Sequence, residues 1–116
     1  MTPRAYRLTP AAESDVAGVL RHTLRRFDAW QQQDYAKLIL RAIDMVAEQP
    51  LRPASRDRSE LGPGVRSFHL HLAGRRQGAA AHLLFYRMEV SEPRLVILRV
   101  LHEAMDPASH LEDMGG

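Results

Sequence analysis

Four side chains in the second half of the sequence could act together on a phosphodiester. An arginine guanidinium can hold a phosphate through two parallel hydrogen bonds, and a histidine can exchange a proton near neutral pH. Such a set could activate a ribose hydroxyl and stabilise the charge that develops on phosphorus. The residues are Arg66, Arg87, Arg99 and His102. Because no lysine cluster accompanies them, an interface or ion-pair role for the arginines is the stronger interpretation.

Three other histidines could bind a metal ion. His69 and His71 are two residues apart, so they face the same side of an extended strand, and His82 could lie across a hairpin from them. Three imidazoles suit zinc. Histidines on the solvent face of a strand explain the pattern as well, and we expect neither a metal ion nor a cofactor.

Length and composition indicate one globular domain that spans residues 1–116. The sequence is 45% hydrophobic and 26% charged, which is ordinary for a soluble domain. It has no cysteine, which excludes disulfides and thiolate catalysis. No apolar run approaches the ~20 residues of a membrane helix, so we expect a cytoplasmic protein with no membrane partner.

Charge is nearly balanced, with 16 Lys and Arg against 14 Asp and Glu. Lys37 is the single lysine, and the predominance of arginine suits bidentate recognition of carboxylates at an interface, or reflects codon usage in a GC-rich genome. A net charge of +2 does not indicate a nucleic-acid-binding protein.

A short strand, Arg4–Leu8, and a helix are predicted at the start of the chain. Thr9 is a good N-cap, and Pro10 suits the first helical position because it lacks the N–H that would be left unpaired there. The helix then carries one apolar stripe at spacings of three and four residues. Its members are Val16, Leu20, Leu24 and Phe27.

A second helix follows directly, so the two should form an antiparallel hairpin. Asp28 is its predicted N-cap, and Pro50 ends it near Gln49. Trp30 is expected to pack over the turn between the helices, with partner contact as the alternative. The hairpin also carries four arginines, which form either a solvated face or a basic binding surface. They are Arg21, Arg25, Arg26 and Arg41.

Residues 50–64 form a predicted surface connection that leads into three antiparallel strands. The expected strands are 66–72, 81–88 and 95–101, joined by loops at 73–78 and 91–94. In the first strand Phe68, Leu70 and Leu72 would share one face. The tail after the last strand is expected to be short and helical or frayed. The fold class is therefore α+β, with a two-helix hairpin packed on one sheet.

The last two strands are apolar on both faces, which conflicts with a sheet that has one solvated side. The two helices can cover only one face of this sheet. We therefore expect an external partner on the other face, because a large exposed apolar patch usually marks an interface. Two alternatives stay open: the long loop and tail fold over the patch, or the protein self-associates through it.

The order of these elements resembles the RelE/ParE superfamily of bacterial toxins, and several segments are similar to its ParE branch. Together the segments span nearly the whole chain, and their order and spacing carry the resemblance. They are Tyr6–Ala12, Ala47–Pro50, Gly64–Phe68, Leu84–Arg87 and Ile97–Asp106.

The resemblance implies a toxin of a type II toxin–antitoxin system. Such toxins inhibit DNA gyrase by stabilising its cleaved DNA complex, and a ParD-like antitoxin neutralises them in a hetero-oligomer. The resemblance therefore implies contact with DNA only indirectly, through the antitoxin or gyrase. Two alternatives remain: a RelE-like endoribonuclease that cleaves messenger RNA on the ribosome, or a non-toxic co-repressor that only binds its antitoxin.

The resemblance and the apolar strands together suggest two sets of binding residues and no catalytic residue. The expected antitoxin-binding residues on and beside the apolar sheet face are Phe85, Arg87, Ile97, Arg99 and Leu101. The expected residues for target binding and toxicity are Arg66, Arg99, His102, Met105 and Asp106.

Overall fold

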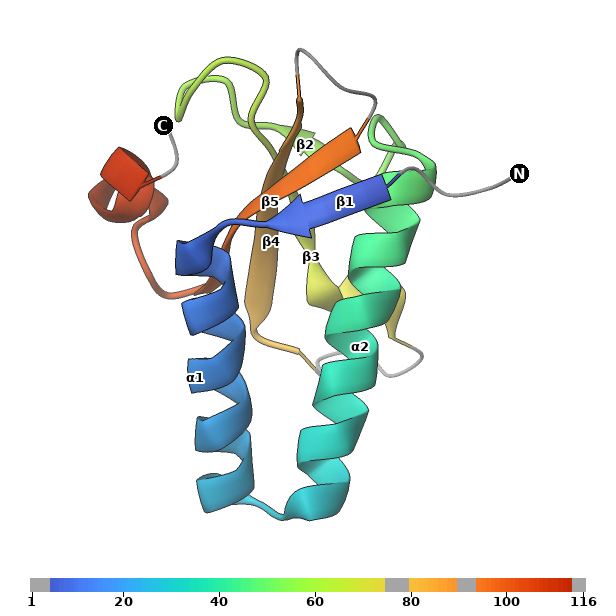
Figure 1. The fold of residues 1–116 in the computed structure, drawn as a ribbon, viewed down its shortest axis with the longest axis vertical. Coiled ribbons are helices and arrows are strands. Elements are labelled where there is room, and N and C mark those ends of the chain that lie inside the picture. The colour runs from blue at the N-terminus through green and yellow to red at the C-terminus, as the bar shows by residue number, and fades with distance from the viewer. Residues whose placement is uncertain (1–4, 75–79, 90–93, 114–116) are drawn as a thin grey trace.

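The computed structural model describes residues 5–74, 80–89 and 94–113, so Arg4 and most of both predicted hairpin loops lie outside the described part. Its elements form an α+β fold, as predicted (Figure 1). In chain order they are β1 (Ala5–Leu8), α1 (Pro10–Arg26), α2 (Ala29–Glu48), β2 (Arg56–Asp57), β3 (Arg66–His69), the 3₁₀ helix η1 (Leu70–Ala73), β4 (His82–Met88), β5 (Arg94–His102) and the 3₁₀ helix η2 (Pro107–Asp113). None of the helices in these residues is long and apolar enough to cross a bilayer.

The strands form one mixed sheet in the order β1-β5-β4-β3-β2. The antiparallel meander β3-β4-β5 is the one predicted, and β1 adds to its far edge in parallel with β5. The two-residue strand β2 was not predicted. It lies inside the 50–64 connection and pairs with β3.

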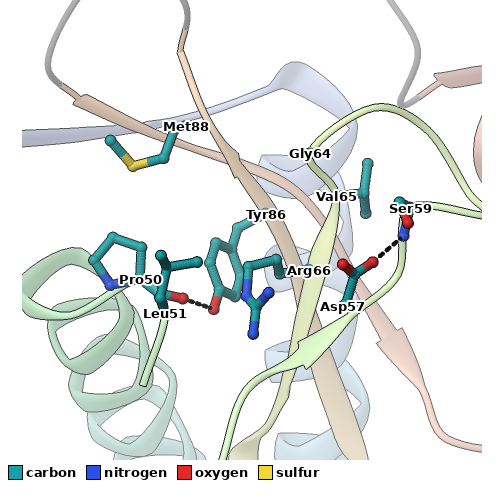
Figure 2. A pocket seen from close by; sticks show the side chains of 9 residues that line it. All are labelled: Pro50, Leu51, Asp57, Ser59, Gly64, Val65, Arg66, Tyr86 and Met88. Atoms are coloured by element: carbon teal, nitrogen blue, oxygen red, sulfur yellow. Dashed lines mark hydrogen bonds between the residues drawn. The ribbon is translucent and has the colours of Figure 1, made fainter. Parts of the chain in front are cut away.

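Both helices begin at the predicted caps. The Thr9 hydroxyl accepts a hydrogen bond from the Ala12 N–H at 3.1 Å and donates to the Leu98 carbonyl at 2.8 Å, which ties the start of α1 to β5. The Asp28 carboxylate accepts from the Gln31 N–H at 2.8 Å at the start of α2. Helix α2 ends at Glu48, and Figure 2 shows Pro50 just beyond it from close by.

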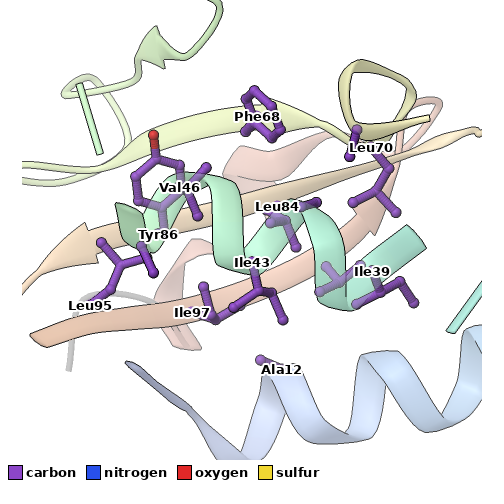
Figure 3. Packing of buried hydrophobic residues seen from close by; sticks show 14 of the residues in the cluster. Ala12, Ile39, Ile43, Val46, Phe68, Leu70, Leu84, Tyr86, Leu95 and Ile97 are labelled. Atoms are coloured by element: carbon purple, nitrogen blue, oxygen red, sulfur yellow. The ribbon is translucent and has the colours of Figure 1, made fainter. Parts of the chain in front are cut away.

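The main core lies between the helical hairpin and the inner face of the sheet (Figure 3). Ile43 and Val46 of α2 are fully buried against β4 and β5, where Leu84 and Ile97 are also inaccessible. Apolar side chains from both layers thus leave water together, which is the main stabilising contribution to a fold of this size.

The hairpin extends past the end of the sheet, and its far end is not buried (Figure 1). Val16 and Leu20 pack against the core as expected, but Leu24 and Phe27 are 45% and 59% exposed. Trp30 is 75% exposed, so the expected packing of Trp30 over the turn is wrong. The apolar stripe of α1 therefore extends beyond the end of the sheet against which it packs.

The first meander strand is shorter than predicted. β3 ends at His69, and the 3₁₀ helix η1 replaces the rest of the expected 66–72 strand. The His69 ring accepts a hydrogen bond from the His71 N–H at 3.1 Å, which starts the helical turn. Leu70 is still buried, whereas Leu72 is 37% exposed and does not share a face with it.

The outer face of the sheet is covered by the chain itself, so the expectation of a bare apolar face is wrong. A second buried cluster forms there from Val65, Phe85, Val96, Leu98 and Leu101. Val65 and the partly buried Leu61 come from the end of the long connection, and the Arg58 guanidinium lies 5.5 Å from the centre of the Phe85 ring. The alternative in which the long loop folds over the patch is therefore the correct one.

A β-bulge in β5 explains which residues reach this outer cluster. Tyr86 pairs with Ile97 and Phe85 pairs with Arg99, so Leu98 is an extra residue opposite that step. Ile97 consequently faces the helices with no exposed surface, and not the outer face where it was expected.

Candidate functional site

A small pocket opens where α2 ends and no longer covers the sheet (Figure 2). Its volume is about 280 Å³. Its lining combines an apolar side with an arginine, a carboxylate and a serine. The lining residues are Pro50, Leu51, Asp57, Ser59, Gly64, Val65, Arg66, Tyr86 and Met88.

Arg66 forms one wall of this pocket and is held in place by the loop before β2. Its Nη2 donates to the Ser55 Oγ at 2.8 Å and to the Ser55 carbonyl at 3.2 Å. Beside it, the buried Tyr86 hydroxyl donates to the Pro50 carbonyl at 2.7 Å. Hydrogen bonds from Ser59 hold the pKa of Asp57 below its usual value, so the pocket mouth pairs a carboxylate with a fixed guanidinium.

Arg99 occupies a different place, at the junction of α1, β5 and η2. It forms two hydrogen bonds to the Asp15 carboxylate, Nε to Oδ2 at 2.7 Å and Nη2 to Oδ1 at 2.9 Å. Its Nη1 also donates to the His110 carbonyl at 3.4 Å. Only 9% of Arg99 is exposed, so its first role is to hold these three elements together.

The remaining residues expected at the target site lie on one exposed turn after β5. The His102 ring accepts from the Ala104 N–H at 3.0 Å, and Met105 is 41% exposed. The Asp106 carboxylate accepts from the Ala108 N–H and the Ser109 hydroxyl, each at 3.1 Å, and so caps η2. The structure therefore brings His102, Met105 and Asp106 together and leaves them accessible.

The possible phosphodiester set is not assembled. Arg66 pairs with Tyr86, whereas His102 pairs with His82, four residues away along β4. Four residues of an extended strand span about 13 Å. Arg66 and His102 therefore do not meet around one phosphate in this arrangement.

A cluster of histidines lies at the end of the sheet nearest the hairpin turn. The Tyr35 hydroxyl is 2.6 Å from His82 Nδ1, and the rings of His82 and His102 meet edge to face at 5.2 Å. Burial, together with the neighbouring His102 and His22, lowers the pKa of His82 to about 4. The Tyr35 oxygen also accepts the Ala81 N–H at 3.3 Å.

The sequence alone did not bring Tyr35 and Glu103 into this group. The His69 Nε2 and a Glu103 carboxylate oxygen lie 2.7 Å apart, and the pKa of Glu103 is lowered by this hydrogen bond. Counting the hairpin register between β4 and β5 would have placed His82 opposite His102. The α2 partner, Tyr35, has no comparable sequence signal.

The histidines do not form the suggested zinc site. Both ring nitrogens of His69 already have partners, Glu103 on one side and the His71 N–H on the other. Within residues 5–74, 80–89 and 94–113, no three His, Asp or Glu side chains could hold a metal ion together.

Arginines surround the covered outer face. Arg87 follows Phe85 by two residues on β4 and is half-buried. Arg7 and Arg94 both pair with Glu89, and these pairs lower the pKa of its carboxyl group. We call the group the arginine rim; it consists of Arg7, Arg58, Arg87 and Arg94.

The rim differs from the antitoxin-binding residues expected from the sequence. Phe85, Ile97 and Leu101 are at most 3% exposed and offer almost no surface in the folded chain. Of the five expected residues, only Arg87 is accessible to a substantial degree.

The four arginines of the expected basic surface on the hairpin do not lie together. Arg21, Arg25 and Arg26 are exposed near the end of α1. Arg41 lies farther along the hairpin and donates to the Ala73 carbonyl at 3.4 Å, so it supports η1 instead.

Comparison with known sequences identifies similar toxins over nearly the whole chain. The family model described as the ParE toxin of the type II toxin–antitoxin system parDE matches residues 6–107. Toxin ParE1 of Caulobacter vibrioides is 32% identical over 108 residues, which cover 93% of this chain and 98% of the relative. Toxin ParE of Escherichia coli is 33% identical over 111 residues and 94% of each chain.

Comparison with solved structures finds the same fold in two toxin–antitoxin complexes. A chain of the chromosomal ParDE system from P. aeruginosa aligns with a TM-score of 0.65 and 16% identity, over 88% of this chain and 98% of that one. A chain of the RelBE2 complex from Mycobacterium tuberculosis aligns with a TM-score of 0.52 and 26% identity, over 86% and 98%.

Proposed function

Since this chain belongs to the ParE toxin family of type II toxin–antitoxin systems, we propose that it inhibits DNA gyrase. It acts by binding gyrase and stabilising the cleaved DNA complex, which blocks replication. A ParD-like antitoxin binds the toxin and keeps it inactive in the cytoplasm. The observation that carries this proposal is the family match over residues 6–107, which includes both helices and the whole meander.

The arrangement of the sheet supports inhibition by binding over catalysis. General acid–base cleavage of RNA needs its cation and its proton carrier around the same phosphate. Arg66 is committed to Ser55, and His102 lies several residues away along the sheet. The rim and the exposed turn after β5 instead offer surfaces for proteins.

The arginine rim is the proposed binding surface for the antitoxin. Arginine forks bind carboxylates bidentately, so an acidic segment of the antitoxin would suit this surface. Arg87 contacts this segment directly. Phe85 and Leu101 support the surface from beneath, in the buried outer cluster. Ile97 faces the helices, and Arg99 holds the junction of α1, β5 and η2.

The exposed turn after β5 is the proposed binding surface for gyrase. His102, Met105 and Asp106 lie there together, and Arg99 positions the turn through the His110 carbonyl. Arg66 contributes from its pocket as a separate contact.

A cleavage assay tests this proposal. Purified toxin is incubated with gyrase and supercoiled plasmid, and covalent complexes are trapped with detergent and protease. We expect linear DNA that depends on both gyrase and ATP-driven turnover, and its loss when the ParD-like antitoxin is added first. Plasmid that stays supercoiled at saturating toxin contradicts the proposal.

Two further measurements separate the alternatives. A ribonuclease would cleave messenger RNA on ribosomes and leave DNA intact. A co-repressor would cause no growth arrest when the toxin gene is expressed alone. The gyrase proposal predicts growth arrest with filamentation and an SOS response.

A further inference from the structure

Four charged side chains on the outer side of α2 are arranged against the electrostatics of their own helix. Lys37, Arg41, Asp44 and Glu48 are spaced by four, three and four residues, so they form one stripe along the helix. Its two cations are neighbours at a spacing of four residues, and so are its two carboxylates, and like charges at this spacing destabilise a helix. The carboxylates also lie in the last two turns of α2, near the negative end of the helix dipole.

Helix α1 shows the usual arrangement. Glu13 lies in its first turn and Arg25 and Arg26 lie in its last turn, where the dipole stabilises each charge. The last turn of α2, in contrast, has no basic residue. The unfavourable order of charges is therefore a feature of α2 alone in this hairpin, and compensation by a partner outside the helix would explain it.

The described part of the chain does not supply this compensation. Within residues 5–74, 80–89 and 94–113, no ion pair joins Lys37, Asp44 or Glu48 to an opposite charge, and Asp34, one turn before Lys37, is not paired with it. Arg41 donates to a backbone carbonyl of η1. All four charged side chains of the stripe are exposed, on the side of α2 that is turned away from the sheet (Figure 1).

The charge pattern of the stripe complements itself when two copies of α2 lie antiparallel. In a two-fold interface the same patch is used by both copies, and residues meet when they lie equally far from the axis on opposite sides of it. With the axis between residues 42 and 43, Lys37 and Glu48 each lie about 8 Å from it along the helix. Arg41 and Asp44 each lie about 2 Å from it.

Every cation of one copy then meets a carboxylate of the other. Lys37 faces the partner's Glu48, and Arg41 faces the partner's Asp44. A parallel arrangement would instead place like charges side by side. Leu40, which is 53% exposed, lies less than one turn from the axis and adds apolar area to the contact.

We propose that the outer side of α2 is a self-association surface, on which a second copy of this chain binds through an antiparallel pair of α2 helices. The two cations and two carboxylates sum to no net charge, so the stripe does not suit a partner of one sign, such as DNA or an acidic peptide. A pattern that complements its own reverse is instead the requirement of a symmetric dimer.

The dimer leaves the surface proposed for the antitoxin open. Helix α2 covers the inner face of the sheet, whereas the outer cluster and the arginine rim belong to the opposite face. Each copy in the dimer therefore keeps its own antitoxin surface. The inference does not depend on gyrase inhibition, and its tests need neither gyrase nor DNA.

Sedimentation of the purified full-length chain at increasing concentration is the first test. We expect a reversible monomer–dimer equilibrium at low salt, and dissociation of the dimer as salt is added, because the paired charges lie near the surface. A chain that stays monomeric at every concentration at low salt overturns the inference.

Two charge-reversed variants test the pairing. Lys37→Glu/Arg41→Glu makes the stripe wholly acidic, and Asp44→Lys/Glu48→Lys makes it wholly basic. We expect the dissociation constant of each variant's dimer to rise by about tenfold or more, because like charges now meet across the axis. An equimolar mixture of the two variants should dimerise again, since each then meets the opposite charge. A mixture that stays monomeric overturns the inference.

The variant that exchanges both pairs tests the antiparallel arrangement. Lys37→Glu/Arg41→Glu/Asp44→Lys/Glu48→Lys reverses all four charges and remains complementary to its own reverse, so it should dimerise as the wild type does. Its basic residues now lie near the C-terminus of α2, where they favour the helix, so the thermal midpoint should not fall. A folded but monomeric exchange variant overturns the inference.

The matched control reverses two exposed charges on the other helix. Arg25→Glu/Arg26→Glu should leave the dimer unchanged, because neither residue lies on α2. An equal loss of dimer in this control would show a general charge effect and overturn the inference. So would a wild-type monomer whose charge-reversed variants lose the antitoxin, because that result assigns the stripe to the antitoxin.

Discussion

Arg99 and Asp15 are 84 residues apart in sequence and form a two-point ion pair, Nε to Oδ2 at 2.7 Å and Nη2 to Oδ1 at 2.9 Å. Their side chains are only 11% and 14% exposed. Oδ2 of Asp15 also accepts the Val100 N–H at 3.0 Å, so one carboxylate joins α1 to both the side chain and the backbone of β5.

Asp15→Asn should destabilise the fold by about 3 kcal/mol. The substitution leaves the nearly buried Arg99 charge without its counter-ion, which costs more than the pair itself contributes. Urea unfolding measures the loss. Glu13→Gln, on the exposed side of the same helix, is the control and should cost well under 1 kcal/mol. Equal stability of both variants would contradict a structural role for the pair.

Tyr86→Phe should destabilise the fold by about 1 kcal/mol, because it removes the shorter of two hydrogen bonds to the buried Pro50 carbonyl and leaves only the Ser55 hydroxyl at 3.3 Å. Tyr6→Phe, at a residue that is 38% exposed, is the matched control and should leave the free energy of unfolding unchanged. Chemical denaturation of the two variants makes the comparison. A Tyr86→Phe variant as stable as wild type would show that the Ser55 hydroxyl alone satisfies the carbonyl.

Phe85→Ala should destabilise the fold by about 3–4 kcal/mol, since it opens a cavity in the outer cluster beneath Arg58. Leu40→Ala removes an exposed leucine and should have little effect. Thermal unfolding and binding of a hydrophobic dye report the two changes. A Phe85→Ala variant of normal stability that no longer binds the antitoxin would restore the expectation of a bare outer face.

Acidification should destabilise the fold through His82. Its pKa is about 4 in the folded protein and near 6.5 when unfolded, so the unfolded chain binds more protons between these values. Stability therefore falls as the pH drops from 6.5 towards 4. The loss is roughly 1–2 kcal/mol after allowing for the partial exposure of the ring.

His82→Gln isolates this contribution. The variant removes the titrating group, so its unfolding free energy should depend less on pH between 6.5 and 4 than that of the wild type. Urea unfolding at several pH values measures the difference. The same pH dependence in both proteins would show that His82 does not titrate in this range.

Local chemistry made the helices and the meander predictable from the sequence. Thr9 and Asp28 are side chains that cap helices, and Pro50 cannot continue one, so the bounds of both helices followed from single residues. The strands of the meander were found for the same reason, as apolar runs between turn residues.

Long-range geometry could not be predicted in this way. Phe68, Leu70 and Leu72 alternate as a strand does, yet a side-chain hydrogen bond of His69 ends the strand. The bulge at Leu98 reverses the expected facing of Ile97, and no composition signal marks it. The covering of Phe85 by Arg58 and Val65 depends on the path of the long connection.

The same distinction between local sequence and long-range contacts applies to the candidate site residues. Accessibility of the His102–Asp106 turn could be expected from its polar sequence and its place at the end of the chain's last strand. Burial of Arg99 depends on its ion pair with Asp15, a residue far away in sequence. No sequence pattern around either residue predicts this ion pair.

The parallel pairing of β1 with β5 ties the assembly of the protein to its synthesis. Ala5 of the first strand registers with Arg94 of the last, so the sheet edge stays incomplete until almost the whole chain has left the ribosome. A nascent chain that stops before β5 also lacks Arg99 and the turn after it. Interrupted translation therefore yields fragments that lack the last strand, the Arg99–Asp15 ion pair and the turn proposed to contact gyrase.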